Sequence, residues 1–225
     1  MSPPTARFVA VHGLPTSPAL WAGVATRVPM LTPALGGVGT VAPRASWTLD
    51  DFVADLLPFL DGDTVLIGHD LGGVVAAMAA TRVPLRALVL SGTALGPYWA
   101  PVRFTARAPL HRYFYEHHAG RKFLTGAVSP PLRSEVVAAF PPVPELPARM
   151  RAIAQAMTPP ADLAKNLRLP VHLLWGRNDR WYPPVVARAV ARGTDASLTW
   201  VPGGHLCMWE FPDAYALALR ALFLR

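Results

Sequence analysis

The chain has 225 residues, of which 52% are hydrophobic and 16% charged, so we expect one compact domain with a sizeable core rather than disorder. Its net charge of +7 comes from arginines scattered along the chain, which argues against a nucleic-acid-binding face, because such a face gathers its charge on one element. There is no signal-peptide pattern and no membrane-spanning stretch, and the single cysteine, Cys207, allows no intrachain disulfide. We therefore predict a cytoplasmic protein that binds neither nucleic acid nor membrane; the oligomeric state stays open. The Ala-, Arg- and Pro-rich composition favours a bacterial gene of high GC content.

Short apolar runs alternate along the chain with longer stretches of helical spacing. Apolar runs bounded by turn residues are typical of strands buried on both faces of a parallel sheet. Six runs are predicted as strands, namely residues 7–11, 38–42, 64–67, 87–90, 171–175 and 198–201. Helices are predicted at residues 20–27, 49–60, 71–82, 184–192 and 213–224, so most strands precede a crossover helix. The pattern predicts an α/β fold with a mostly parallel sheet flanked by helices.

One long interval breaks this alternation. From Thr93 to about Leu169 there is no clear strand, while prolines, aromatic residues and short amphipathic stretches accumulate. The interval is too long for a plain loop. We predict that residues 96–167 form a helical cap inserted after the fourth strand, where open α/β sheets bind ligands, and that residues 1–95 and 168–225 form the core.

The segment 65–73, VLIGHDLGG, has the order strand, Gly-x-Asp-x-Gly, helix, which is the order of a nucleophile elbow. Small residues at Gly68 and Gly72 let the strand and helix approach closely, and this turn raises residue 70 above the sheet. The amino terminus of the following helix favours a negative charge there. The segment therefore predicts Asp70 as a nucleophile, with a helix-capping aspartate in a glycine-rich turn as the alternative.

The first predicted strand runs directly into His12-Gly13-Leu14-Pro15. A turn of this kind leaves a backbone N–H group beside the elbow. We predict that the N–H groups of Leu14 and Leu71 form an oxyanion hole. The alternative is an ordinary turn at the end of a strand.

Two more polar residues follow the last two predicted strands. Asp179 lies in the turn after residues 171–175, and His205 follows the strand at 198–201. Nucleophile, acid and histidine in this chain order indicate a catalytic triad of Asp70, Asp179 and His205.

With these elements identified, the sequence resembles the α/β-hydrolase superfamily, and within it the branch of epoxide hydrolases and haloalkane dehalogenases. HGLPTSPALW at residues 12–21 is similar to the His-Gly-x-Pro segment of that branch, and GHDLGG at 68–73 is similar to its elbow. The resemblance covers nearly the whole chain. It implies an α/β-hydrolase fold with a six-stranded sheet, an edge hairpin missing, and a short helical cap after the fourth strand.

An aspartate at the elbow narrows the reaction. A carboxylate that attacked an acyl ester would form an anhydride, whereas attack on a saturated carbon with a leaving group forms an alkyl ester. His205, oriented by Asp179, would then activate water to cleave that ester at the carbonyl group of Asp70. One nucleophile, one base and one backbone hole suffice, so no metal or organic cofactor is implied.

The leaving group is either a halide or an epoxide oxygen. In the dehalogenases that the chain resembles, halide donors lie at the positions of Leu14 and Leu71, which here have no side-chain N–H. An epoxide needs an O–H donor, and the sequence offers tyrosines. We predict a small-molecule substrate, a bulky apolar epoxide such as a secondary metabolite, bound by Trp181, Tyr182, Tyr98, Tyr113, Tyr115 and Trp209.

Two alternatives stay open. An indole N–H of Trp181 or Trp209 could bind a halide, which would favour a haloalkane dehalogenase-like hydrolase. A non-catalytic ligand-binding protein with the same fold is the other, since a fold does not determine a function.

Overall fold

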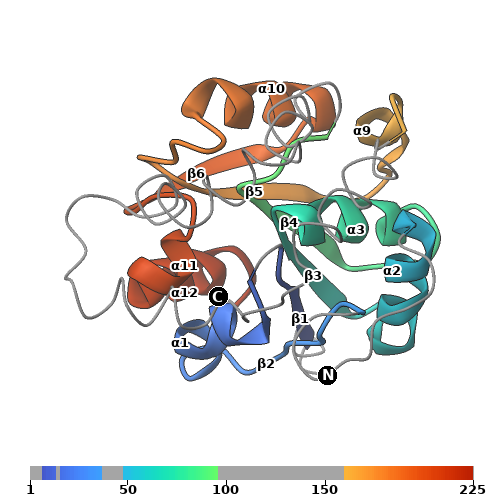
Figure 1. The fold of residues 1–225 in the computed structure, drawn as a ribbon, viewed down its shortest axis with the longest axis horizontal. Helices are drawn as coiled ribbons and strands as arrows, with labels where there is room; N and C mark the ends of the chain where they lie inside the picture. Colours follow the sequence, from blue (N-terminus) through green and yellow to red (C-terminus); the bar gives the residue numbers. More distant parts are fainter. Residues whose placement is uncertain (1–6, 14–15, 37–47, 96–159, 225) are drawn as a thin grey trace, which may run out of the picture.

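A computed structural model describes residues 7–13, 16–36, 48–95 and 160–224 (Figure 1). Within these residues six strands form one sheet in the order β2-β1-β3-β4-β5-β6, and every neighbouring pair is parallel. The strands are β1 (Arg7–Val11), β2 (Met30–Leu31), β3 (Thr64–His69), β4 (Ala87–Ser91), β5 (Val171–Gly176) and β6 (Ser197–Val201). The predicted α/β-hydrolase architecture, with a six-stranded parallel sheet flanked by helices, is confirmed.

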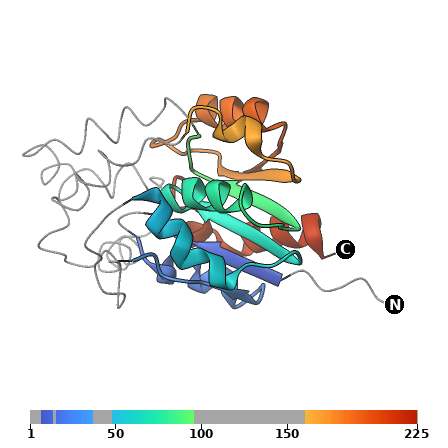
Figure 2. The ribbon, with the colours of Figure 1, turned by 90° about the vertical axis from the view of Figure 1, so that its right-hand side faces the viewer.

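Helices cover both faces of the sheet (Figures 1 and 2). One face carries α2 (Leu49–Leu56), which continues into η2 (Leu57–Phe59), together with α3 (Leu71–Ala80), α9 (Leu163–Asn166) and α10 (Pro184–Thr194). The other face carries η1 (Pro18–Trp21), α1 (Ala22–Ala25), α11 (Cys207–Glu210) and α12 (Pro212–Phe223). We call the hydrophobic core under the helices α2, α3, α9 and α10 the first layer, and the core under η1, α1, α11 and α12 the second layer. Side chains alternate between the two layers along each strand, as the pleat requires: in β3, Leu66 packs in the first layer, and Val65 and Ile67 pack in the second.

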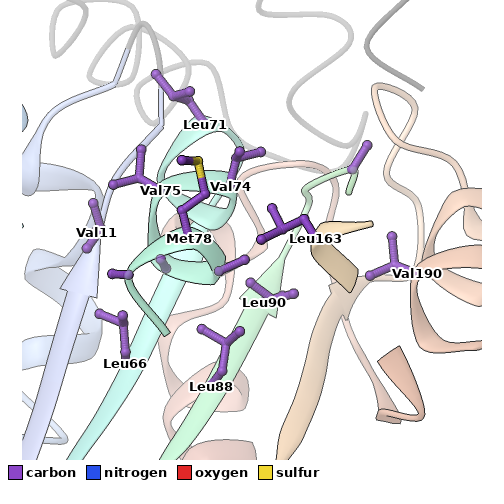
Figure 3. Close-up of a cluster of buried hydrophobic side chains, with 14 of the residues drawn as sticks. Val11, Leu66, Leu71, Val74, Val75, Met78, Leu88, Leu90, Leu163 and Val190 are labelled. Atoms are coloured by element: carbon purple, nitrogen blue, oxygen red, sulfur yellow. The ribbon is translucent and has the colours of Figure 1, made fainter. Parts of the chain in front are cut away.

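Helix α3 is the most deeply buried helix of the first layer, and it positions the site. Val74 and Val75 of α3 pack in one cluster with Leu66 of β3 and Leu88 of β4, and Leu163 of α9 closes the same cluster (Figure 3). Residues 71–79 are all buried. Burial on this scale fixes the helix against the sheet, because each buried aliphatic side chain stabilises the fold by about 1.5–3 kcal/mol.

Five predicted strands coincide with described strands: β1 has the predicted bounds, and the other four are longer by one or two residues at an end. The strand predicted at residues 38–42 lies outside the described residues. The sequence did not indicate β2, whose two residues, Met30 and Leu31, pair with β1 at the edge of the sheet. A strand this short carries no readable hydrophobic alternation.

The predicted helix at 20–27 is divided into η1 and α1, and the one at 49–60 into α2 and η2. Helix α2 begins where the sequence predicts, because Thr48 and Asp51 form a reciprocal capping box. The α-helical part ends before Pro58, whose ring removes a backbone donor.

The predicted cap, residues 96–167, lies outside the described residues except for its last eight. Those residues include α9, whose Leu163 is 3% exposed in the first-layer cluster. The division of the chain into core and cap therefore stays a prediction. None of the described helices has both the length and the apolar character needed to cross a bilayer.

Candidate active site

Asp70 connects β3 to α3 with a strained backbone. It is the N-cap residue of α3 with φ 50° and ψ −119°, a left-handed conformation that costs a non-glycine residue about 1–3 kcal/mol. Neighbouring elements hold this conformation. The Asp70 N–H donates to the Ser91 carbonyl (3.2 Å), and the Asp70 carbonyl accepts from Thr93 Oγ1 (2.6 Å) and from the Gly73 N–H (3.0 Å). These hydrogen bonds fix Asp70 in a sharp strand-to-helix turn, where the residue is 6% exposed.

The turn after β1 lies directly against this elbow. A Cβ atom on Gly13 would lie 2.6 Å from Asp70 Oδ2, and one on Gly72 would lie 2.3 Å from the His12 carbonyl oxygen. His12 keeps the turn in place as a neutral imidazole: Nδ1–H donates to the Gly13 carbonyl (2.8 Å), and Nε2 accepts from the Leu35 N–H (3.2 Å). Burial lowers the pKa of His12 to about 4, which agrees with the neutral form.

Of the two predicted oxyanion donors, Leu71 is described and Leu14 lies outside the described residues. Leu71 is the first residue of α3, so its N–H belongs to the helix end, where backbone donors have no partner within the helix. Its side chain packs into the first-layer cluster (Figure 3). The oxyanion hole stays a prediction.

His205 and Asp179 form a buried pair. His205 Nδ1 donates to Asp179 Oδ2 at 3.0 Å, and both side chains are at most 3% exposed. The second carboxylate oxygen, Oδ1, accepts the N–H groups of Trp181 and Tyr182, both at 2.8 Å. These three hydrogen bonds orient the carboxylate, which in turn fixes the imidazole tautomer with its lone pair on Nε2.

The charges around His205 favour its protonated form. Burial alone would lower the pKa of His205, but the charge and hydrogen bond of Asp179, with the charges of Asp70 and Glu210, raise it above its ordinary value. Asp70 thus lies near enough to His205 for its charge to act on the imidazole. The structure brings all three predicted triad residues into one buried site.

Gly92, directly after β4, packs against the His205–Asp179 pair. Its φ is +51°, and a Cβ atom there would lie 2.9 Å from His205 Nδ1 and 3.3 Å from Asp179 Oδ2. Only a residue without a side chain leaves room for the imidazole at this place.

Two further side chains, neither of them predicted from the sequence as a site residue, hold the loop that carries His205. His69 Nε2–H donates to the His205 carbonyl at 3.0 Å, and the Gly204 N–H donates to the Glu210 carboxylate. His69 could have been found from its position inside the elbow motif, directly before Asp70. A single acid five residues after His205 is too common a pattern to indicate Glu210.

The predicted substrate-binding residues fall into three groups. Trp181 and Tyr182 lie beside the triad, with ring centroids 6.5 Å and 5.6 Å from that of His205. Trp209 is partly buried and packs against the second-layer cluster. The cap tyrosines Tyr98, Tyr113 and Tyr115 lie outside the described residues.

A protein-family model described as Alpha/beta hydrolase family matches residues 8–219. The chain belongs to the alpha/beta hydrolase family. It is 33% identical over 141 residues to lipase LipV of Mycobacterium tuberculosis (strain ATCC 25618 / H37Rv), an alignment that covers 56% of this chain and 54% of the lipase. The aligned part thus spans about half of the length of this curated relative.

Solved structures of other proteins superpose on nearly the whole chain. The enol-lactonase of Burkholderia xenovorans LB400 has a TM-score of 0.82 at 17% identity, covering 98% of this chain and 92% of its own. The haloalkane dehalogenase DbeA of Bradyrhizobium elkani USDA94 has a TM-score of 0.74 at 18% identity, covering 98% and 90%. At these identities the likeness shows a shared fold.

Proposed function

We propose that this alpha/beta hydrolase opens an epoxide to a vicinal diol through a covalent alkyl ester on Asp70. The observation that carries the proposal is a carboxylate, not a hydroxyl, at the elbow beside the buried His205–Asp179 pair. An ionised carboxylate needs no base to attack a saturated carbon, and the ester it forms is one that water can cleave.

In the first step a carboxylate oxygen of Asp70 attacks one epoxide carbon. The C–O bond of that carbon breaks, and the alkoxide takes a proton from an O–H donor, for which Tyr182 and the cap tyrosines are the candidates. In the second step His205 Nε2 takes a proton from water, and the hydroxide adds to the carbonyl carbon of the ester. The N–H groups of Leu71 and Leu14 would stabilise the oxyanion, and its collapse releases the diol as His205 returns the proton to the leaving oxygen. The carboxylic acid left on Asp70 then gives up its proton, which restores the O–H donor and the ionised nucleophile.

Haloalkane dehalogenation is the second candidate. It is favoured by Trp181, whose ring lies 6.5 Å from that of His205 and whose indole N–H is a halide donor. The same Asp70 ester would form, with a halide ion leaving instead of an alkoxide that stays attached.

His205→Gln is expected to form the ester and hydrolyse it at least about a hundredfold more slowly, because only the second step needs the base. We would measure the intact mass of this variant after exposure to aryl and alkyl epoxides and to alkyl halides. A mass gain of one whole epoxide on the Asp70 peptide would support the proposal. The control, His205→Gln with Asp70→Asn, should gain no mass.

An adduct from an alkyl halide that lacks the halogen, with none from epoxides, would favour the dehalogenase. No adduct from either class, with reversible binding of apolar ligands, would favour a binding protein. Turnover of carboxylic esters by the wild type that is lost in Asp70→Ala would contradict alkyl chemistry at Asp70 altogether.

The pKa of His205 is expected to fall in Asp70→Asn, because the Asp70 charge is one cause of its elevation. NMR titration of the imidazole measures this directly. In wild type the raised pKa means that His205 is protonated at low pH and acts as a base only above that pKa. Ester hydrolysis should therefore slow by about tenfold per pH unit below it. Asp50→Asn, at an exposed acid, is the control, and an unchanged His205 pKa in Asp70→Asn would show that the two groups are not coupled.

A further inference from the structure

Three backbone groups around His205 are tied to three different elements. The Gly203 carbonyl accepts from the Asn178 N–H (2.9 Å) in the turn that carries Asp179. The Gly204 N–H donates to Glu210 in α11, and the His205 carbonyl accepts from His69 at the elbow. The loop that carries the base is therefore held from the acid turn, from the nucleophile elbow and from α11.

Among the groups that hold this loop, Glu210 is a buried carboxylate. It is 9% exposed, and a buried carboxylate costs several kcal/mol unless hydrogen bonds and opposite charge compensate it. The contact also leaves little room at the neighbouring residue, Gly203. Its φ is +108°, and a Cβ atom there would lie 3.0 Å from Glu210 Oε2 and 2.9 Å from Phe211 Cδ2. A side chain at residue 203 would therefore crowd the carboxylate that accepts the Gly204 N–H.

The charge of Glu210 also acts on His205. It is one of the groups that raise the pKa of His205, after Asp179 and Asp70. Among the described residues, the titratable groups that contact or couple to His205 include Asp179, Asp70, Glu210, His69 and Tyr182. His69 brings no competing positive charge, because burial, with the nearby His205 and His12, holds the pKa of His69 well below its ordinary value.

We propose that Glu210 is a positioning residue of the hydrolysis step: by holding the Gly204 N–H, its carboxylate sets the place of the His205 imidazole relative to the ester on Asp70. This inference rests on the proposed function, in which His205 is needed for the second step alone. Glu210 therefore acts on hydrolysis of the ester and not on its formation.

Glu210→Ala is expected to slow ester hydrolysis by about 10- to 100-fold, because a small displacement of a catalytic group has an effect of that size. Ester formation should keep its wild-type rate, so an adduct accumulates on Asp70. Glu210→Gln still accepts the Gly204 N–H through its amide oxygen, and it should restore hydrolysis at high pH. Quench-flow mass spectrometry of both variants resolves the two rates, and Asp213→Asn, which removes an exposed acid three residues away, is the matched control.

NMR titration of His205 in the free protein gives a readout that needs no substrate. Glu210→Gln should lower the pKa of His205, and Asp213→Asn should leave it unchanged.

The proposal is overturned if Glu210→Ala slows formation and hydrolysis equally, or hydrolyses the ester at the wild-type rate. If Glu210→Ala does not fold, Glu210→Gln decides: an unchanged His205 pKa, or hydrolysis at high pH as slow as in His205→Gln, also overturns it. Absence of any adduct even in His205→Gln would instead reject the proposed function, whatever the titration shows.

Discussion

Under the proposed function, Asp70→Ala is expected to reduce kcat/KM for an epoxide by at least about 10⁴-fold, because the variant lacks the carboxylate on which the ester is proposed to form. Alanine keeps the small volume of the elbow, so the thermal midpoint should stay near that of the wild type. Steady-state kinetics and thermal unfolding test the two statements separately. Asp63→Ala, at an exposed acid before β3, is the control for general effects of losing a carboxylate.

A second substitution at the same position tests the chemistry rather than the presence of the nucleophile. Asp70→Ser would place a hydroxyl beside the His205–Asp179 pair, the partners that a serine nucleophile needs. We expect loss of epoxide turnover and a gain of measurable p-nitrophenyl ester hydrolysis. Epoxide turnover that survived in both Asp70 variants would show that the carboxylate is not the nucleophile.

Gly176→Ala is expected to destabilise the fold by about 2–4 kcal/mol and to impair ester hydrolysis in the molecules that fold. A Cβ atom on Gly176 would lie 1.9 Å from the Gly204 carbonyl oxygen and 3.0 Å from that of Gly203. Both atoms are backbone atoms, so no side chain can rotate away. The end of β5 and the loop that carries His205 would have to separate.

Urea unfolding of Gly176→Ala measures this effect against Gly62→Ala, where an added Cβ atom meets nothing within 4 Å. The control should change the free energy of unfolding by less than about 0.5 kcal/mol. An unfolding midpoint of Gly176→Ala equal to the wild-type value would mean that the two segments can move apart without cost.

The sequence was most informative where strands are buried on both faces. β3 and β4 are buried along their whole length, so they stand out as continuous apolar runs between turns. The edge strand β2 and the four-residue helices α9 and α11 were not indicated, because so few residues show no periodicity.

The candidate triad could be predicted from the sequence because each member lies just after a strand, and parallel strands end at one edge of the sheet. The contacts that hold the His205 loop in place could not be predicted in the same way. The contact of Glu210 with Gly204 depends on the positive φ of Gly203 and on the direction of a four-residue helix. Neither feature leaves a pattern in the sequence.

The direct pairing of β4 with β5 has an evolutionary consequence. Leu88 and Leu90 of β4 are in register with Val171 and Leu173 of β5, although residues 96–159 lie between them in the chain. The register of the sheet is therefore set by residues on either side of that long segment. A change in the length or sequence of residues 96–159 need not disturb this pairing, so the segment is free to diverge in evolution while the register of the sheet is kept.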